Sequence, residues 1–374
     1  MSIHIENAII DKEIIENIIE NKEYNKIIIN YYSEFASEFE DDYKNTILNK
    51  VINIDNCNKF WLLDKYEIQK VKDVKRQNLC KDKFCSNCKK VKQSARMARY
   101  IPELEKYSDR LYHMVLTVPN CNGTDLKDTI KHMNKCFKYL IQYIRGDRTT
   151  KDIDFNCWKY EGAVKSLEVT FKGNSYHPHF HIGLVMDPNV LSKRCIQNRY
   201  SINNRGVVRK LSRLFTKEEI LIQKVWYLLV NGQRVNKKNI DNIECVRSKL
   251  GEKIVEDLGY SCMIVKFPPE QYAELFKYVT KEKDEMGKVL TYDNFKSLYN
   301  GLYRVKQIQG YGCLYRIKDD VDLELFEQKY NEYLNILRQK ESPAEVLENP
   351  QDLLLDTSYK LINRKSYFKY LRKL

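Results

Sequence analysis

The chain has 374 residues and a mass of 44.7 kDa, which is long enough for more than one domain and a sizeable core. It carries 64 Lys and Arg against 51 Asp and Glu, a formal net charge of +13, which favours an acidic partner such as nucleic acid. Residues 1–42 hold 11 acidic and 3 basic side chains, a net charge of −8. The binding surface is therefore expected after residue 42.

The composition also disfavours several classes of protein. The opening MSIHIENAII lacks the cationic segment of a signal peptide, and no apolar run approaches the roughly 18 residues that span a bilayer. A cytoplasmic protein is expected, in which the 11 cysteines are thiols or metal ligands rather than disulfides. No GxxxxGK[ST] phosphate loop is present, so DNA unwinding would need a partner such as a host helicase.

The first expected element is an acidic helical segment over residues 1–56, in which Ile recurs at spacings of three and four. A basic lobe over residues 57–105 follows. It ends in a helix-like run to Arg99, and Pro102 is expected to start a new helical turn. The basic side chains of this lobe are the expected DNA contacts, namely Lys83, Lys89, Lys90, Lys92, Arg96 and Arg99.

Residues 106–320 are expected to form the catalytic domain. Short apolar segments bounded by turn-forming residues predict strands at 111–118, 163–171 and 179–186. A helix over 126–144 separates the first two strands, and a hairpin loop over 172–178 joins the last two. This β-α-β-β order predicts an α+β fold with a central antiparallel sheet flanked by helices.

The rest of the chain is less regular. A basic insertion is expected over residues 188–267, with 192–213 as a basic loop or the start of a helix. Pro268 and Pro269 are expected to begin a helix that runs to about residue 284. Residues 321–374 are expected to be mostly helical.

Three of the six histidines fall in His177-Pro178-His179-Phe180-His181. Alternation along a strand points His179 and His181 to one face, as two imidazoles that share a divalent metal require. Glu168, on the preceding hairpin arm, is the expected third ligand. This donor set suits Mn²⁺ or Mg²⁺ beside a phosphate. The alternative is that these histidines are structural.

A cysteine cluster lies in the basic lobe. Cys85-x2-Cys88 has the spacing of a zinc knuckle, and Cys80 and Cys57 would complete a tetrahedral Zn²⁺ site that rigidifies the lobe. The alternative is four unrelated buried thiols.

Glu274, Tyr278 and Lys281 would share one face of the expected helix after Pro268. A tyrosine there can attack phosphorus, a lysine can steady negative charge, and a carboxylate can activate water. An ordinary exposed helix face would show the same residues.

In this order, five segments resemble the rolling-circle replication initiators of small plasmids from Gram-positive bacteria, in the superfamily named for its His-hydrophobic-His (HUH) motif. They span roughly residues 57–316 and read CKDKFCSNCKK, YHMVLTVPN, AVKSLEVTFKGNSYHPHFHIGLVM, ELFKYVTKEKD and LYNGLYRVKQIQGYG. The long basic insertion and the acidic amino-terminal helices depart from what can be matched to this family.

The resemblance implies an HUH-type endonuclease domain, with His179 and His181 as metal ligands, Tyr278 as the nucleophile and Glu274 as the carboxylate that activates water at termination. It implies nicking of plasmid origin DNA, duplex and single-stranded, through a 5′-phosphotyrosine. A mobilisation relaxase and a non-catalytic zinc-containing DNA-binding repressor are the alternatives, and a homodimer stays open.

Overall fold

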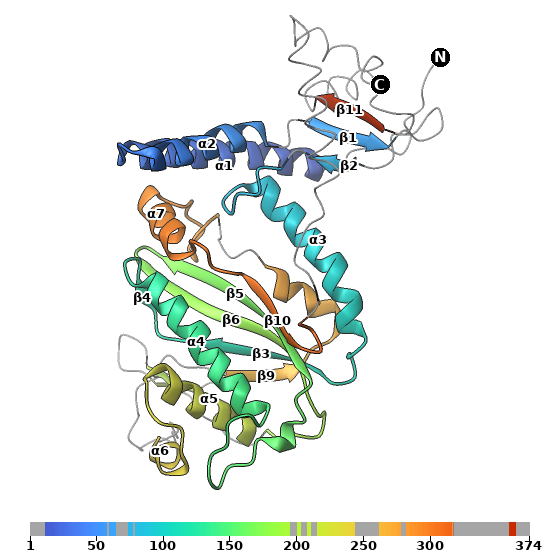
Figure 1. Ribbon diagram of the computed structural model, residues 1–374, viewed down its shortest axis with the longest axis vertical. Helices are drawn as coiled ribbons and strands as arrows, with labels where there is room; N and C mark the ends of the chain where they lie inside the picture. The colour runs from blue at the N-terminus through green and yellow to red at the C-terminus, as the bar shows by residue number, and fades with distance from the viewer. Residues whose placement is uncertain are drawn as a thin grey trace, which may run out of the picture. The chain divides into compact units, whose positions relative to one another are not determined.

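The computed structural model describes residues 12–57, 60–64, 74–77, 79–194, 200–202, 208–210, 215–243, 262–277, 282–315, 317 and 359–363 (Figure 1). The chain divides into two compact units, residues 93–319 and residues 1–92 with 320–374. Each unit is described by itself. None of the helices in the described ranges combines the length and the apolar character needed to cross a membrane.

The unit of residues 93–319 is built around an antiparallel sheet with strand order β10-β5-β6-β3-β9, and β4 pairs with β6 beyond the end of β3 (Figure 1). The strands are β3 (Leu111–Thr117), β4 (Cys121–Asn122), β5 (Gly162–Lys172), β6 (Ser175–Val185), β9 (Cys262–Lys266) and β10 (Ile308–Gly312). The predicted antiparallel sheet of an α+β fold is thereby confirmed. The predicted β-α-β-β order forms its centre, and β9 and β10 add to it from later in the chain.

One face of this sheet is covered by α4 (Leu126–Ile144), whose bounds match the prediction. Its apolar side chains are buried, and the ring of Phe137 lies 5.6 Å from that of Phe180 on β6. Beside it lies α5 (Lys217–Val230), which begins with a Thr216–Glu219 capping box. Two further helices, α6 (Lys237–Asn242) and α7 (Tyr292–Gly301), and the short 3₁₀ helix Asn156–Trp158 complete the periphery.

The other face of the sheet packs on a 3₁₀ helix, Pro269–Phe276, and on the second half of α3 (Ser86–Glu105). Tyr272 and Leu275 are fully buried in this core. Gly183 on β6 makes the close approach feasible, because a Cβ there would lie 3.2 Å from Leu275.

The other unit contains α1 (Lys12–Ser37), α2 (Asp42–Asn56) and a sheet of order β11-β1-β2, formed by Tyr359–Asn363, Phe60–Asp64 and Val74–Gln77. Buried Asp82 joins the two helices, since it accepts 2.8 Å hydrogen bonds from Tyr32 Oη of α1 and Lys50 Nζ of α2. The helical character predicted for residues 1–56 is confirmed over the described part, with a break between Ser37 and Asp42.

Several expected elements are corrected. The predicted loop 172–178 is only the two-residue turn Gly173–Asn174, because β5 and β6 stay paired as far as Lys172 and Ser175. α3 runs through Pro102. Proline in the last turn loses one backbone hydrogen bond, and burial of Tyr100 and Leu104 on the same helix compensates for it.

The helix predicted after Pro268 is also corrected. It is a 3₁₀ helix that ends at Phe276, and Lys277 has extended backbone with ψ 152°. Residues 359–363, predicted helical, form strand β11, where they pair with β1. The rest of residues 321–374 lies outside the described residues.

The basic segment 192–213 contains two short paired strands, β7 (Tyr200–Ile202) and β8 (Val208–Lys210), rather than a helix start. Residues 195–199, 203–207 and 211–214 of the segment lie outside the described residues. The finer division into four domains stays a prediction.

Lys165 on β5 is buried beneath α4, and this burial lowers its pKa from 10.5 to about 7. Between pH 7 and 10.5, unfolded chains therefore bind more protons at Lys165 than folded chains do. The free energy of unfolding rises with pH in that window. Below it, the loss of stability caused by burying Lys165 no longer changes with pH. Lys165→Met removes the titrating group and keeps the chain length. We expect the variant to be more stable at pH 7, by on the order of a few kcal/mol, and its stability to change less between pH 7 and 10.

Urea unfolding at the two pH values measures this prediction. A variant less stable than the wild type at pH 7 would contradict it.

Candidate functional site

Glu168, His179 and His181 meet on the sheet face that carries the 3₁₀ helix. Glu168 on β5 lies directly opposite His179 on β6, and His181 is two residues further along the same face. The Glu168 Oε2 atom lies 3.2 Å from His179 Nε2 and 2.9 Å from His181 Nε2. Only 5% of the Glu168 side chain is exposed, so the carboxylate is nearly dry.

A backbone carbonyl sets the tautomer of His179. Its Nδ1 lies 3.2 Å from the carbonyl oxygen of His177, and because a carbonyl can only accept, the proton resides on Nδ1. In the neutral ring, Nε2 then presents a lone pair towards Glu168. Ligand atoms of Glu168, His179 and His181 all lie within 4.8 Å of one another, so a carboxylate and two imidazoles could hold a metal ion here.

His113 on β3 is a site residue that the sequence did not indicate. Its Nε2 lies 3.1 Å from His181 Nδ1, and its ring stacks between those of His181 and Phe267. Burial, followed by the nearby His181, lowers the pKa of His113 to about 4, so the ring is neutral at pH 7. A neutral His113 can accept the Nδ1 proton of His181, which leaves Nε2 of His181 free to bind a metal.

Glu274 lies on the 3₁₀ helix and is partly exposed, with its carboxylate 2.5 Å from Lys277 Nζ. This ion pair joins residues three apart. The peptide after Lys277 is held from the other side, because Gln307 Nε2 donates a 2.6 Å hydrogen bond to the Lys277 carbonyl and Arg96 donates to Gln307 Oε1 at 2.5 Å. Arg96 and Gln307 therefore fix the backbone from which Tyr278 continues.

The other two predicted catalytic residues, Tyr278 and Lys281, lie outside the described residues. Because the helix ends at Phe276, the expectation that Glu274 and Tyr278 lie one α-helical turn apart on a shared face does not hold. In the sequence, Tyr278 follows Lys277, directly after the 3₁₀ helix that packs on the sheet face of Glu168, His179 and His181.

The four predicted cysteines also come together. Cys57 Sγ lies 3.5 Å from the sulfurs of Cys85 and Cys88, and Cys80 Sγ lies 3.5 Å from that of Cys88. Backbone N–H groups of Cys80 and Lys81 donate to the sulfurs of Cys57 and Cys88 at 3.4 Å and 3.2 Å. Hydrogen bonds from the neighbouring thiols, first from Cys57, lower the pKa of Cys85.

These sulfur separations exceed the roughly 2 Å of a disulfide and are close to the edge of a tetrahedron around one ion with Zn–S bonds of about 2.3 Å. The four thiols, three of them buried, could therefore hold a metal ion.

The six basic residues predicted to contact DNA differ in accessibility. Lys83 and Lys92 are exposed and Arg99 is half-buried. Lys89 is buried, with its ammonium 5.0 Å from the centre of the Tyr24 ring, and Arg96 is buried against Gln307. Burial disfavours direct DNA contact by Lys89 and Arg96 in this structure, and their contact with DNA stays a prediction. Lys90 lies on α3.

Part of the chain is similar to known replication proteins. Residues 71–200 match the family model described as "Replication protein". This part of the chain is similar to replication proteins. This confirms the resemblance to plasmid replication initiators, with which the HUH superfamily is consistent. The family match includes Cys80, Cys85 and Cys88 as well as Glu168, His179 and His181.

Curated Rep relatives match a larger share of the chain. A "Protein rep" of Staphylococcus aureus is 27% identical over 46% of this chain and 73% of its own length. Those of Lentilactobacillus hilgardii and Streptococcus pneumoniae are 23% and 24% identical over 66% and 63% of this chain, and 67% and 61% of their own lengths. No solved structure matches the chain.

The position of His113 predicts that it orients a metal ligand. His113→Phe keeps the stacked ring and removes the nitrogen that accepts the His181 proton, so His181 is free to rotate or change tautomer. We expect Mn²⁺ affinity to fall roughly 10- to 100-fold, the usual cost of losing such a support. Titration calorimetry with Mn²⁺, an ion that oxygen and nitrogen ligands prefer over thiolates, measures it.

His132→Phe, on α4 and remote from Glu168, is the matched control. Equal Mn²⁺ affinities of the two variants would show that His113 has no part in the site.

Proposed function

We propose that the chain is a rolling-circle plasmid replication initiator with an HUH-type catalytic domain, which acts in the cytoplasm. It nicks one strand of origin DNA through Tyr278, stays attached by a 5′-phosphotyrosine, and later rejoins the strand. The supporting observation is that Glu168, His179 and His181 converge on the sheet face covered by the 3₁₀ helix that leads into Tyr278.

The donor set of Glu168, His179 and His181 fits Mn²⁺ or Mg²⁺, which would polarise a non-bridging oxygen of the scissile phosphate. The hydroxyl oxygen of Tyr278 forms a bond to phosphorus, and the bond from phosphorus to the 3′ oxygen breaks. The leaving 3′ oxygen takes up a proton and the tyrosine loses one. The number of phosphodiester bonds is unchanged, so the free 3′ hydroxyl can prime synthesis without an energy source.

Glu274 is proposed to accept a proton from the water that releases the chain at termination. Its carboxylate is partly exposed and forms an ion pair with Lys277, so water can reach it. Lys281 is proposed to steady the negative charge of the phosphate. Duplex and single-stranded origin DNA are the proposed partners, with a host helicase to separate the strands.

Substitutions separate the roles of these residues. Tyr278→Phe removes the attacking oxygen, so no covalent protein–DNA adduct should form on a labelled origin oligonucleotide. Glu274→Gln keeps the nucleophile, so the adduct should form and persist. His179→Ala should lower the cleavage rate at least 100-fold, because a metal ligand is lost. Denaturing gels of the labelled strand measure all three.

Tyr315→Phe, which alters an exposed tyrosine, is the matched control and should behave as the wild type. An adduct with Tyr278→Phe would assign the nucleophile to another tyrosine. A wild-type protein that binds origin DNA without any adduct would favour the repressor alternative. A mobilisation relaxase would give the same adduct but would not support replication from the origin.

The cysteine cluster is proposed to hold one structural Zn²⁺. We expect about one zinc per chain by elemental analysis, with loss of zinc and a lower melting temperature in Cys85→Ser, because structural zinc contributes on the order of 10 kcal/mol to folding. Cys157→Ser alters an exposed thiol outside the cluster and should keep the metal. A zinc-free wild type of full stability would refute the assignment.

A further inference from the structure

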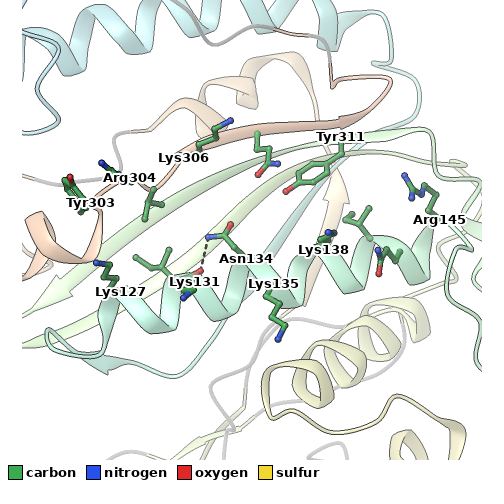
Figure 2. A pocket seen from close by; sticks show the side chains of 15 residues that line it. Lys127, Lys131, Asn134, Lys135, Lys138, Arg145, Tyr303, Arg304, Lys306 and Tyr311 are labelled. Carbon is green, nitrogen blue, oxygen red and sulfur yellow. Dashed lines mark hydrogen bonds between the residues drawn. The ribbon is translucent and has the colours of Figure 1, made fainter.

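A basic groove lies between α4 and residues 303–311, the segment that joins α7 to β10 and includes most of β10 (Figure 2). It encloses about 790 Å³, and no Asp or Glu is among the residues that line it. One wall carries Lys127, Lys131, Lys135 and Lys138 of α4, and the other carries Arg304 and Lys306.

The α4 lysines form one continuous stripe. Their spacings of four, four and three residues place them on the same side of the helix, and a rise of 1.5 Å per residue spreads them over about 16 Å. All four are exposed. In the described part of the chain no carboxylate lies within ion-pair distance of Lys131, Lys135 or Lys138. A row of cations without counter-charges strongly attracts a polyanion that runs along the helix.

A buried cation lies behind one of the residues that line the groove. Lys165 on β5 is 1% exposed and donates a hydrogen bond to the side-chain oxygen of Asn134, which lines the groove. Its ammonium also lies 4.5 Å from the centre of the Phe180 ring. Burial lowers the pKa of Lys165 to about 7.

Aromatic rings lie among these cations. Tyr303 is 43% exposed, with Lys127 and Arg304 at 5.9 Å and 5.2 Å from its ring centre, and Tyr311 lies on the floor. Exposed rings beside a basic track are typical of single-strand binding, where bases stack on them.

The groove and the metal site lie on opposite faces of one sheet. Lys165 and Glu168 are three residues apart on β5, so alternation points them to opposite sides. The groove also borders β10, the edge strand next to β5. A strand that leaves Glu168 would cross only that edge to reach the α4 lysines.

From these observations we infer that the basic groove binds the sugar-phosphate backbone of single-stranded DNA, as a second contact outside the catalytic face. This inference rests on the proposed function, in that the bound strand is the origin strand that continues from the nicking site. The groove would keep that strand on the protein while its end is held at Tyr278.

The test measures binding of a fluorescent deoxythymidine oligonucleotide to the full chain by anisotropy at several salt concentrations. Lys131→Ala/Lys135→Ala is compared with Lys151→Ala/Lys238→Ala, which removes the same charge from exposed sites outside the groove. Loss of two phosphate contacts should lower the slope of log affinity against log salt by about 1.4, and affinity on the order of tenfold. The control should keep the wild-type slope.

Equal slopes for the groove and control variants would overturn the inference. A duplex that competes as well as the single strand would overturn the assignment to single strands. The assay needs no cleavage, so a failure of nicking would refute the proposed function and leave this result standing.

Discussion

The pairing of β5 with β6 is the constraint on which the rest of this structure depends. The two strands stay in register from Gly162 opposite Val185 to Lys172 opposite Ser175. Because successive side chains alternate between faces, this register places Glu168, His179 and His181 on one side and Lys165 and Phe180 on the other. A slip of one residue would put the imidazoles beneath α4 and the phenylalanine ring at the metal site.

The side chains that this register brings together are largely buried. The Glu168 side chain is 5% exposed, and the two histidines facing it are 13% and 12% exposed. A carboxylate in so dry a position attracts a cation more strongly than it would in water. His113 extends the arrangement by one further hydrogen bond, which comes from β3 on the far side of β6. The site is therefore held by three adjacent strands, with no dependence on a loop.

The sequence predicts the elements whose signals are local. The bounds predicted for α4 match those of the structure, and the HxH pattern together with Glu168 predicted three side chains that meet. It missed features that depend on distant partners. In the sequence, His113 is a single histidine within an apolar strand, and only the pairing of β3 with β6 places it beside His181. Lys89 and Arg96 look like surface cations until Tyr24 and Gln307 cover them.

The 3₁₀ helix was missed for a related reason. Its residues favour an ordinary α-helix, but Tyr272 and Leu275 are three apart, a spacing that aligns side chains in a 3₁₀ helix, and both are buried against the sheet. Packing outweighed local propensity there, and the chain leaves the helix before Tyr278.

Strand β5 carries two buried charges of opposite sign within four residues, Lys165 towards α4 and Glu168 towards the 3₁₀ helix. Because a buried charge is costly unless it is compensated, a strand with both would be a poor choice for stability alone. Each is partly compensated within the chain, Lys165 by its hydrogen bond to Asn134 and Glu168 by the two imidazoles beside it. A cation bound at Glu168 would offset the remaining cost on that face, as the proposed metal site requires.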